Sequence, residues 1–183
     1  MFISRRIFLV PLADNDHGKT TMIRALVAQG LGKAMRRQRK GVRQLVSPHG
    51  RNIDSYLFGR SYQEVEKIKH KSVTKALDAN DPDWRRRELI LMPSHISDIA
   101  NKSGPDDITQ IIDAAHSAGF DVICASVVFS GSAEEDLSGY YPIWSRNWDE
   151  RWTVPNPGNY QPAGQLDALG RDLWTWTCRA IAG

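Results

Sequence analysis

The segment that most constrains the fold of this chain is an apolar run followed at once by a polar loop that contains a glycine. Residues Ile7–Leu12 are continuously apolar, which is typical of a strand buried on both faces of a sheet. The loop Ala13–Thr21 follows, and Lys19–Gln29 has the apolar spacing of a helix, with Gly30 and Gly32 suited to its C-terminal cap. We therefore predict a buried strand, a tight loop and a helix in direct succession.

The loop matches the phosphate-binding pattern G-x-x-x-x-G-K-[ST], the Walker A motif, at every fixed position except the first. In such a loop, backbone N–H groups and the helix N-terminus converge on the phosphates of a nucleotide. The residues predicted to bind the nucleotide are Ala13, Asp14, Asn15, Asp16, His17, Gly18, Lys19, Thr20 and Thr21. The alternative is a chance Gly-Lys-Thr sequence at the start of a helix.

Each fixed position of the loop has an expected role. Gly18 lets the backbone approach the phosphates, and Lys19 neutralises the β- and γ-phosphates during transfer. The Thr20 hydroxyl is the expected Mg²⁺ ligand, and Thr21 is expected to reach the α-phosphate. Ala13 stands where the motif has its first glycine, so either a reshaped loop or weaker nucleotide binding is expected there.

The rest of the chain alternates between strand-like and helix-like segments. The further expected strands are Arg43–Ser47, Leu89–Met92, Asp121–Phe129 and Trp152–Val154, and the further expected helices are Ser61–Ala79, Asp106–Ala118 and Gln165–Ile181. This alternation predicts a three-layer α/β fold, with a mainly parallel five-stranded sheet and helices on both faces. At 183 residues we expect one domain, 1–183, with a lid at about 130–151.

The net charge of +3 is too small to indicate a nucleic-acid partner, but the local distribution of charge is informative. Basic residues are concentrated in Lys33–Arg43 and again in Arg85–Arg87. Such clusters are either solvated faces or a track for a polyanion. Both interpretations remain open from the sequence.

Two features of the sequence, its cysteines and its apolar segments, indicate the cellular compartment of the protein. Cys124 and Cys178 have no metal-ligand spacing, so free thiols in a reducing compartment are expected. The apolar run after Arg5 and Arg6 is too short for a secretory signal, and no stretch approaches the roughly 18 apolar residues of a membrane span. We expect a cytoplasmic protein without a membrane partner, in the host cytoplasm if it is viral.

Along nearly its whole length the chain resembles small P-loop kinases. These enzymes bind the acceptor after the second strand, close an arginine-carrying lid after the fourth, and end in a strand, an adenine loop and a helix. The resemblance implies ATP and Mg²⁺ as cofactors. It also implies that Arg146 and Arg151 clamp the transferring phosphoryl group and that Asn156 and Pro157 contact adenine.

A kinase also needs a carboxylate that orients or deprotonates the acceptor hydroxyl. Asp54, which we place just beyond the second strand, is the first candidate, with Asp14 and Asp16 of the loop as rivals. A helix cap or turn residue is an equal alternative for Asp54. The other residues expected to bind the acceptor are Arg51 and Arg60, which flank Asp54, and Ser94 and His95 at the end of the third strand.

A GTPase switch is a weaker alternative. The run Asp16–Thr21 resembles the D-H-G-K-T-T loop of translation-factor GTPases. However, Asn101-Lys102-Ser103-Gly104 lacks the Asp that reads guanine, and the D-x-x-G match at Asp136–Gly139 comes after it, in the wrong order. The absence of guanine motifs favours ATP.

Within the P-loop kinases, the chain looks most similar to phage kinases that act on 5-hydroxymethyluracil in DNA and to polynucleotide kinase-like enzymes. The resemblance rests on Gly59-Arg60-Ser61-Tyr62, Pro93-Ser94-His95 and the pair Arg146 and Arg151. It implies ATP-dependent phosphorylation of the hydroxymethyl group of 5-hydroxymethyluracil in phage DNA, a step toward hypermodified thymidine.

A DNA acceptor would have to be single-stranded or present its base outside the helix, because a base inside a duplex cannot reach a deep cleft. The aromatic residues expected to stack on such a base are Tyr140, Tyr141, Trp144, Trp148 and Trp152. Packing of these residues in the core is the alternative. A kinase for a free nucleoside, nucleotide or other small metabolite, and a nucleotide-binding module without transferase activity, also remain open.

Overall fold

The computed structural model describes residues 4–14, 18–96, 106–129, 137–156 and 163–183. Its centre is a six-stranded sheet in the order β2-β3-β4-β1-β5-β6. All neighbouring strands are parallel except the β2–β3 pair. The strands are β1 (Ile7–Leu12), β2 (Gly41–Val46), β3 (Asn52–Leu57), β4 (Leu89–Leu91), β5 (Asp121–Phe129) and β6 (Glu150–Asn156). The protein is therefore α/β with a mainly parallel sheet, as predicted.

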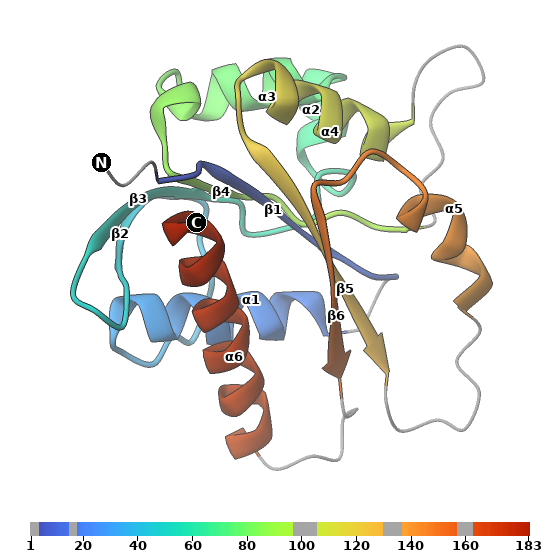
Figure 1. Ribbon diagram of the computed structural model, residues 1–183. Coiled ribbons are helices and arrows are strands. Elements are labelled where there is room, and N and C mark those ends of the chain that lie inside the picture. Colours follow the sequence, from blue (N-terminus) through green and yellow to red (C-terminus); the bar gives the residue numbers. More distant parts are fainter. Residues whose placement is uncertain (1–3, 15–17, 97–105, 130–136, 157–162) are drawn as a thin grey trace.

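Helices cover both faces of this sheet (Figure 1). They are α1 (Lys19–Leu31), α2 (Glu66–His70), α3 (Val73–Asn80), α4 (Asp107–Ser117), α5 (Tyr141–Trp144) and α6 (Ala163–Ala182), with short 3-10 turns at Trp84–Arg86 and Leu137–Gly139. Strand β1 has no exposed residue. Phe8 and Val10 pack toward α3 and α4, while Ile7 and Leu9 pack toward α1 and α6. The continuous apolar run thus reflects burial on both faces.

The prediction of five strands is wrong, because the sequence reading missed β3. The tripeptide Pro48-His49-Gly50 does not end a lone strand but forms the turn of an antiparallel β2–β3 hairpin. Gly50 has φ 81° and its N–H donates to the Ser47 carbonyl at 2.9 Å. The mixed pattern of Asn52–Leu57 hid the strand, since only its second half is apolar.

The single helix expected at Ser61–Ala79 is also corrected. The structure has two shorter helices, α2 and α3, which are separated at Lys71. Lys71 adopts a left-handed conformation with φ 64°, and Ser72 then caps α3 by accepting a hydrogen bond from the Lys75 N–H at 3.3 Å. The apolar stripe continues across the break, so periodicity alone did not reveal it.

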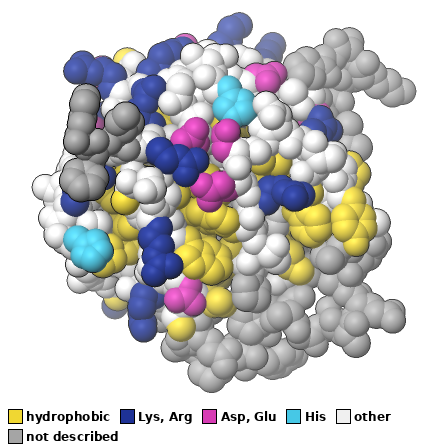
Figure 2. All heavy atoms as spheres, in the orientation of Figure 1, with side chains coloured by type: hydrophobic (Ala, Val, Ile, Leu, Met, Phe, Trp, Pro, Cys, Tyr) yellow, Lys and Arg dark blue, Asp and Glu magenta, His cyan; other side chains and the backbone are white. Residues whose placement is uncertain are grey.

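Charged side chains join β1, β5 and β6 on the face shown in Figure 2, where acidic, basic and histidine side chains lie beside one another. Arg5 donates to Asp121 at 2.6 Å and to Glu150 at 2.8 Å. Asp149 accepts from the Val122 N–H at 2.7 Å, and one of its oxygens lies 2.8 Å from His116 Nε2. These contacts hold the amino ends of three strands in register.

The helices that follow β1 and β4 pack on opposite faces of the sheet. From β1 the chain continues into α1, which packs on one face, whereas α4, the next helix after β4, packs on the other. Because β1 and β4 are neighbours, their carboxyl ends flank a topological switch point, which is where open α/β sheets bind ligands. Among the described residues, no helix has the length and apolar character needed to cross a membrane.

Candidate functional site

The loop after β1 starts at this switch point. Ala13 is fully buried, and its N–H lies 3.4 Å from the Ser94 carbonyl, while the Ser94 N–H donates to Pro11 at 3.0 Å. The loop is therefore attached to the end of β4 as well as to β1. Asn15, Asp16 and His17, which were predicted to bind a nucleotide, lie outside the described residues.

The described part of the loop has a glycine in a left-handed conformation at the start of α1. Gly18 is the N-cap of α1 with φ 83°, a left-handed conformation that favours glycine. Gly18 gives no side-chain cap, so the first-turn amides of α1 can point at an anion. Ala13 has a negative φ, since Lys71 is the sole non-glycine residue with positive φ in the described part of the chain. An alanine therefore fits at position 13 without backbone strain.

Lys19 is folded back into the loop. Its side chain belongs to a residue that is only 7% exposed, and Nζ donates to the carbonyls of Ala13 at 2.6 Å and Asp14 at 2.7 Å. Nζ also lies 3.2 Å from His95 Nδ1. Burial of an ammonium group is costly unless such partners surround it. The loop thus holds a positive charge beside the α1 N-terminus, with the Thr20 side chain exposed next to it.

The end of β4 meets the segment that follows β3. His95 donates its backbone N–H to Gln63 Oε1 at 3.1 Å, and Gln63 Nε2 donates to Ser94 Oγ at 2.8 Å. The His95 ring places Nε2 3.4 Å from Glu64 Oε1, and Arg60 Nη1 lies 4.0 Å from the other oxygen of Glu64. Of the predicted acceptor residues, His95 contacts Lys19, Ser94 is bonded to Gln63 and to the His95 carbonyl, and Arg60 lies near His95 through Glu64.

Gln63 and Glu64 are site residues that sequence reasoning missed. The sequence pattern places both in the predicted helix Ser61–Ala79, because it does not reveal β3 or the carboxyl end of that strand. The apolar triplet Tyr56-Leu57-Phe58 followed by Gly59 was the available signal for a buried strand end. Glu64 is the carboxylate that the structure brings to Lys19 through His95.

Asp54 and Arg51 lie elsewhere, and the prediction that Asp54 is beyond the second strand is wrong. Asp54 lies within β3, and its carbonyl accepts a hydrogen bond from Glu88 at the amino end of β4. Lys19 lies past the carboxyl end of β1 and His95 past that of β4, at the opposite end of the parallel strands. The Asp54 carboxylate accepts from Arg87 at 2.8 and 3.0 Å, and Arg51 forms an ion pair with Glu88.

Arg146 and Arg151 do not form a pair in one lid segment. Arg146 contacts the N-terminus of α4, where it donates to Thr109 Oγ1 at 2.7 Å and forms an ion pair with Asp106. Arg151 belongs to β6, not to a lid, and donates to the Trp144 carbonyl at 3.0 Å. The described part of 130–151 packs on the sheet, since Tyr140 and Ile143 belong to the core.

Asn156 is the last residue of β6 and pairs with Phe129 of β5, at the edge of the sheet where the parallel strands end. The sequence predicted Asn156 in a loop after the last strand, whereas the structure places it within β6, and its contact with adenine stays a prediction. Pro157, the second residue of that prediction, lies outside the described residues.

Most of the aromatic residues expected to stack on a base are packed instead. Tyr140 is buried, and Trp144 donates from Nε1 to Ser126 Oγ at 2.8 Å. Trp148 packs against the same core cluster, and Trp152 packs on α6 with its ring 5.8 Å from that of Trp176. Tyr141 differs, because it is 61% exposed on α5. Its ring lies edge-on to that of Trp144, with the centroids 5.6 Å apart.

The basic segment 33–43 passes close to Gly59, which follows β3. A Cβ on Gly59 would lie 3.1 Å from the Gln38 carbonyl oxygen and 3.4 Å from the Lys40 amide, so Gly59 allows this segment to pack closely. Lys40 pairs with Glu66 at 2.8 Å. Gly59 precedes Arg60, so residues 38–40 of the basic segment lie next to the start of the segment that carries Arg60.

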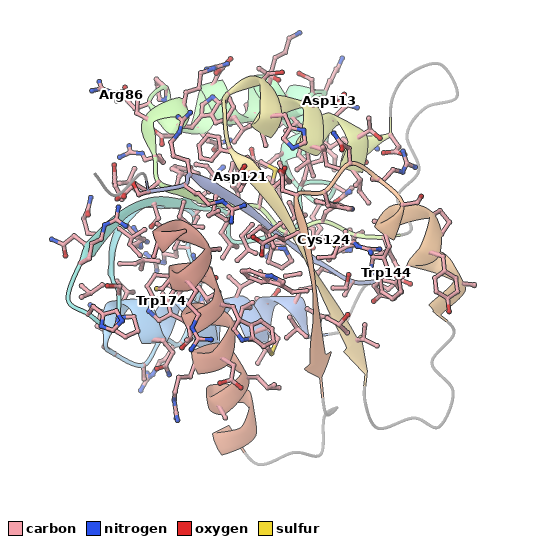
Figure 3. All side chains as sticks on the ribbon, viewed as in Figure 1. Arg86, Asp113, Asp121, Cys124, Trp144 and Trp174 are labelled. Atoms are coloured by element: carbon pink, nitrogen blue, oxygen red, sulfur yellow. The ribbon has the colours of Figure 1, made fainter. Side chains whose placement is uncertain are left out.

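The two thiols behave as packing groups. Burial raises the pKa of Cys124, in β5, to about 11, and that of Cys178 to about 12. Cys124 Sγ lies 3.3 Å from Ser126 Oγ, on the strand to which Trp144 also bonds (Figure 3). Both cysteines are free, as expected.

Among the described residues, no group of three or more His, Cys, Asp or Glu side chains is arranged to hold a metal ion. A magnesium ion that accompanies a nucleotide does not need such a group, because it takes most of its ligands from phosphates and water. The exposed hydroxyl of Thr20, next to buried Lys19, fits this requirement. No family model matches the sequence, and the search of curated proteins gives no match.

Proposed function

We propose that the chain is a P-loop phosphotransferase, a single kinase domain of the three-layer P-loop NTPase type. It transfers the γ-phosphoryl group of ATP to a hydroxyl acceptor. The observation that carries this proposal is the position of Lys19, whose ammonium lies inside the loop between two carbonyls and His95, at the N-terminus of α1. A buried cation next to helix amides is an arrangement suited to an anion with several phosphates.

The site residues have the following roles in the proposed reaction. The amides after Gly18 and the Lys19 ammonium hold the phosphates, and the Thr20 hydroxyl holds Mg²⁺. Bound Mg²⁺ would neutralise charge on the β- and γ-phosphate oxygens. Glu64 replaces Asp54 as the proposed base: it accepts the proton of the acceptor hydroxyl as the acceptor oxygen bonds to the γ-phosphorus and ADP leaves.

The clamp assigned to Arg146 and Arg151 would require both side chains to leave their present partners. Arg146 is the better candidate for this role, because it is bound to Asp106 and Thr109 at the N-terminus of α4, the helix that follows β4. Arg151 lies within a strand and is bonded to a carbonyl of α5. We therefore retain Arg146 as the candidate for phosphoryl contact and regard Arg151 as a support for α5.

For the acceptor we propose the hydroxymethyl group of 5-hydroxymethyluracil in phage DNA, with the enzyme in the host cytoplasm. Two observations support a polyanionic acceptor. The basic segment passes Gly59 beside Arg60, and Tyr141 presents an exposed ring. A basic track and a stacking side chain are the features that bind single-stranded nucleic acid. A free nucleoside, nucleotide or other small metabolite is the alternative acceptor.

The test uses γ-labelled ATP, Mg²⁺ and a panel of acceptors: plain DNA, DNA with 5-hydroxymethyluracil or 5-hydroxymethylcytosine, DNA with a free 5′-hydroxyl, and free nucleosides and nucleotides. Label on hydroxymethylated DNA alone supports the proposed acceptor, and label on nucleosides or nucleotides alone contradicts it. ATP binding without transfer to any acceptor would indicate a nucleotide-binding module. Lys19→Met is the control, and loss of several kcal/mol of phosphate stabilisation is expected for it.

A further inference from the structure

A short segment after β4 joins the two sides of the proposed site. On the phosphate side, the Ser94 N–H donates to the Pro11 carbonyl at 3.0 Å, and the Ser94 carbonyl accepts from the Ala13 N–H at 3.4 Å. On the acceptor side, the Tyr62 N–H donates to the Pro93 carbonyl at 2.9 Å. The phosphate loop and the segment after β3 are therefore attached to the same stretch of backbone.

The side chain of Gln63 completes this attachment. Its Oε1 accepts a hydrogen bond from the His95 N–H at 3.1 Å, and its Nε2 donates to Ser94 Oγ at 2.8 Å. Gln63 is 7% exposed and Ser94 is fully buried, so the loss of either bond would leave a buried polar group unpaired, which is costly. Glu64, the proposed base, is the next residue in the chain. The Gln63 amide thus determines where the backbone of Glu64 lies relative to the end of β4.

The hydrogen bonds at the end of β4 require an amide at position 63. The Ser94 hydroxyl has a single hydrogen and donates it to the His95 carbonyl at 3.1 Å, so Ser94 Oγ can only accept from Gln63. The His95 N–H can only donate. A side chain that serves both groups must therefore have a donor and an acceptor side by side, as a carboxamide does. A carboxylate of the same length has acceptors alone.

We propose that Gln63 is a positioning residue that holds Glu64 at the correct distance from the phosphate loop, an inference that rests on the proposed function. Phosphoryl transfer requires the acceptor and the γ-phosphate in near-attack geometry, and a misplacement of about 1 Å can lower the rate by about 100-fold. Gln63 acts through the backbone and the serine at the end of β4. The hydrogen bonds of Lys19 Nζ to the loop carbonyls do not involve it.

Two substitutions test this role in the labelled-ATP assay. Gln63→Glu keeps the acceptor and loses the donor, whereas Gln63→Met loses both. At pH 8 both variants should lower kcat by about 10- to 100-fold. The Kd of ATP should be unchanged, because the loop keeps its own hydrogen bonds. Gln44→Met is the matched control and should keep the wild-type kcat, since Gln44 is exposed in β2 and bonds to Asp54, away from the site.

The pH dependence of kcat distinguishes positioning from a simple loss of packing. A protonated carboxyl has a hydroxyl donor beside a carbonyl acceptor, so it reproduces the pattern of the amide. Burial disfavours the charged form of the carboxyl introduced by Gln63→Glu and raises its pKa. The ratio of kcat in Gln63→Glu to kcat in the wild type should therefore rise as the pH falls from 8 to 6. The ratio for Gln63→Met should stay constant. Lys19, Glu64 and His95, the other titratable groups here, are present in every protein compared.

Wild-type kcat in both Gln63 variants would overturn the proposal. Equal losses that do not depend on pH would overturn it as well, because they would show that the shape of the side chain is needed and not its hydrogen bonds. A higher KM for the acceptor with kcat unchanged would assign Gln63 to acceptor binding instead. Thermal unfolding identifies the variants that are folded at the assay temperature, and if Gln63→Met is not, the pH dependence of Gln63→Glu decides.

Failure of the proposed function gives a different result. If the wild type transfers label to no acceptor, the reaction is refuted, and with it the role of Gln63 in the reaction. Hydrogen exchange in the same proteins then decides whether Gln63 joins the two segments. The backbone amides of Tyr62 and His95 should exchange about tenfold faster in Gln63→Met than in the wild type, with the amides of α1 unchanged. Equal exchange rates in the two proteins would overturn the attachment itself.

Discussion

The Asp54 carboxylate accepts two hydrogen bonds from Arg87 Nη1, at 2.8 and 3.0 Å. This pair lies toward the amino ends of the parallel strands β3 and β4. Arg87 also donates to Asp81 at 2.8 Å, and these hydrogen bonds raise the pKa of its guanidinium. A carboxylate in such a network stabilises the fold. Lys19 and Glu64 lie at the other edge, where the parallel strands end.

Asp54→Asn should therefore change mainly the stability of the protein, and Glu64→Gln mainly its activity. Asp54→Asn should lower the free energy of unfolding by about 1 to 2 kcal/mol and leave ATP binding and transfer unchanged, because Arg87 loses a charged partner. Glu64→Gln should leave stability nearly unchanged, because Glu64 is 38% exposed, and should reduce kcat. Urea unfolding and the labelled-ATP assay measure both. Loss of transfer in a stable Asp54→Asn protein would restore Asp54 as the base.

The two ends of the loop should respond differently to substitution. Gly18→Ala forces an alanine into φ 83°, which costs about 1 to 2 kcal/mol, and should also weaken ATP binding because the amide approach is distorted. Ala13→Gly should lower stability by about 0.4 to 1 kcal/mol and should not strengthen ATP binding, because Ala13 already has a negative φ. Calorimetric titration with ATP measures the affinities. Much tighter binding by Ala13→Gly would show that alanine constrains the loop.

Gly59→Ala should displace the basic segment. The new Cβ would lie 3.1 Å from the Gln38 carbonyl oxygen, so the segment 38–40 has to move away from Arg60. We expect binding of a single-stranded DNA oligonucleotide to weaken by about three- to tenfold, with ATP binding unchanged. Gly139→Ala is the matched control, since its Cβ would make an ordinary 3.6 Å contact with Ile96. Equal DNA affinity in both variants would remove the segment from the acceptor site.

The Asp149 carboxyl should make stability depend on pH. Burial raises its pKa, but the hydrogen bond from the Val122 N–H and the contact with His116 outweigh burial, and the net pKa is below the ordinary value. The carboxylate thus stabilises the fold above its unfolded pKa, and this contribution is lost as the pH falls through the lower, folded value. Asp149→Asn should cost about 1 kcal/mol or less at pH 7, because the side chain is 35% exposed.

The check is a series of thermal unfolding curves from pH 7 down to pH 3 for the wild type and Asp149→Asn. The difference between the two proteins should shrink as the pH falls through the acid range. A constant difference across this range would mean that the charge of Asp149 does not contribute to stability.

The sequence by itself determined the strand, loop and helix around Gly18 and Lys19, because each of these is encoded by neighbouring residues. An apolar run, a glycine at a left-handed position and a helical period act over distances that the chain spans locally. The same holds for α4, where Asp106 caps the helix, and for β5 with its continuous apolar residues. These elements lie where they were predicted.

Only the tertiary structure decided which polar side chains meet at the loop. Asp54 and Glu64 both carry carboxylates, both follow the basic segment 33–43, and lie ten positions apart in the sequence. A hairpin that was not recognised places Asp54 in the first half of β3 and Glu64 beyond the carboxyl end of that strand. Lys19 and His95 meet across 76 residues, because β1 and β4 are neighbours in the sheet. Strand pairing is a long-range choice made by packing, and local pattern does not encode it.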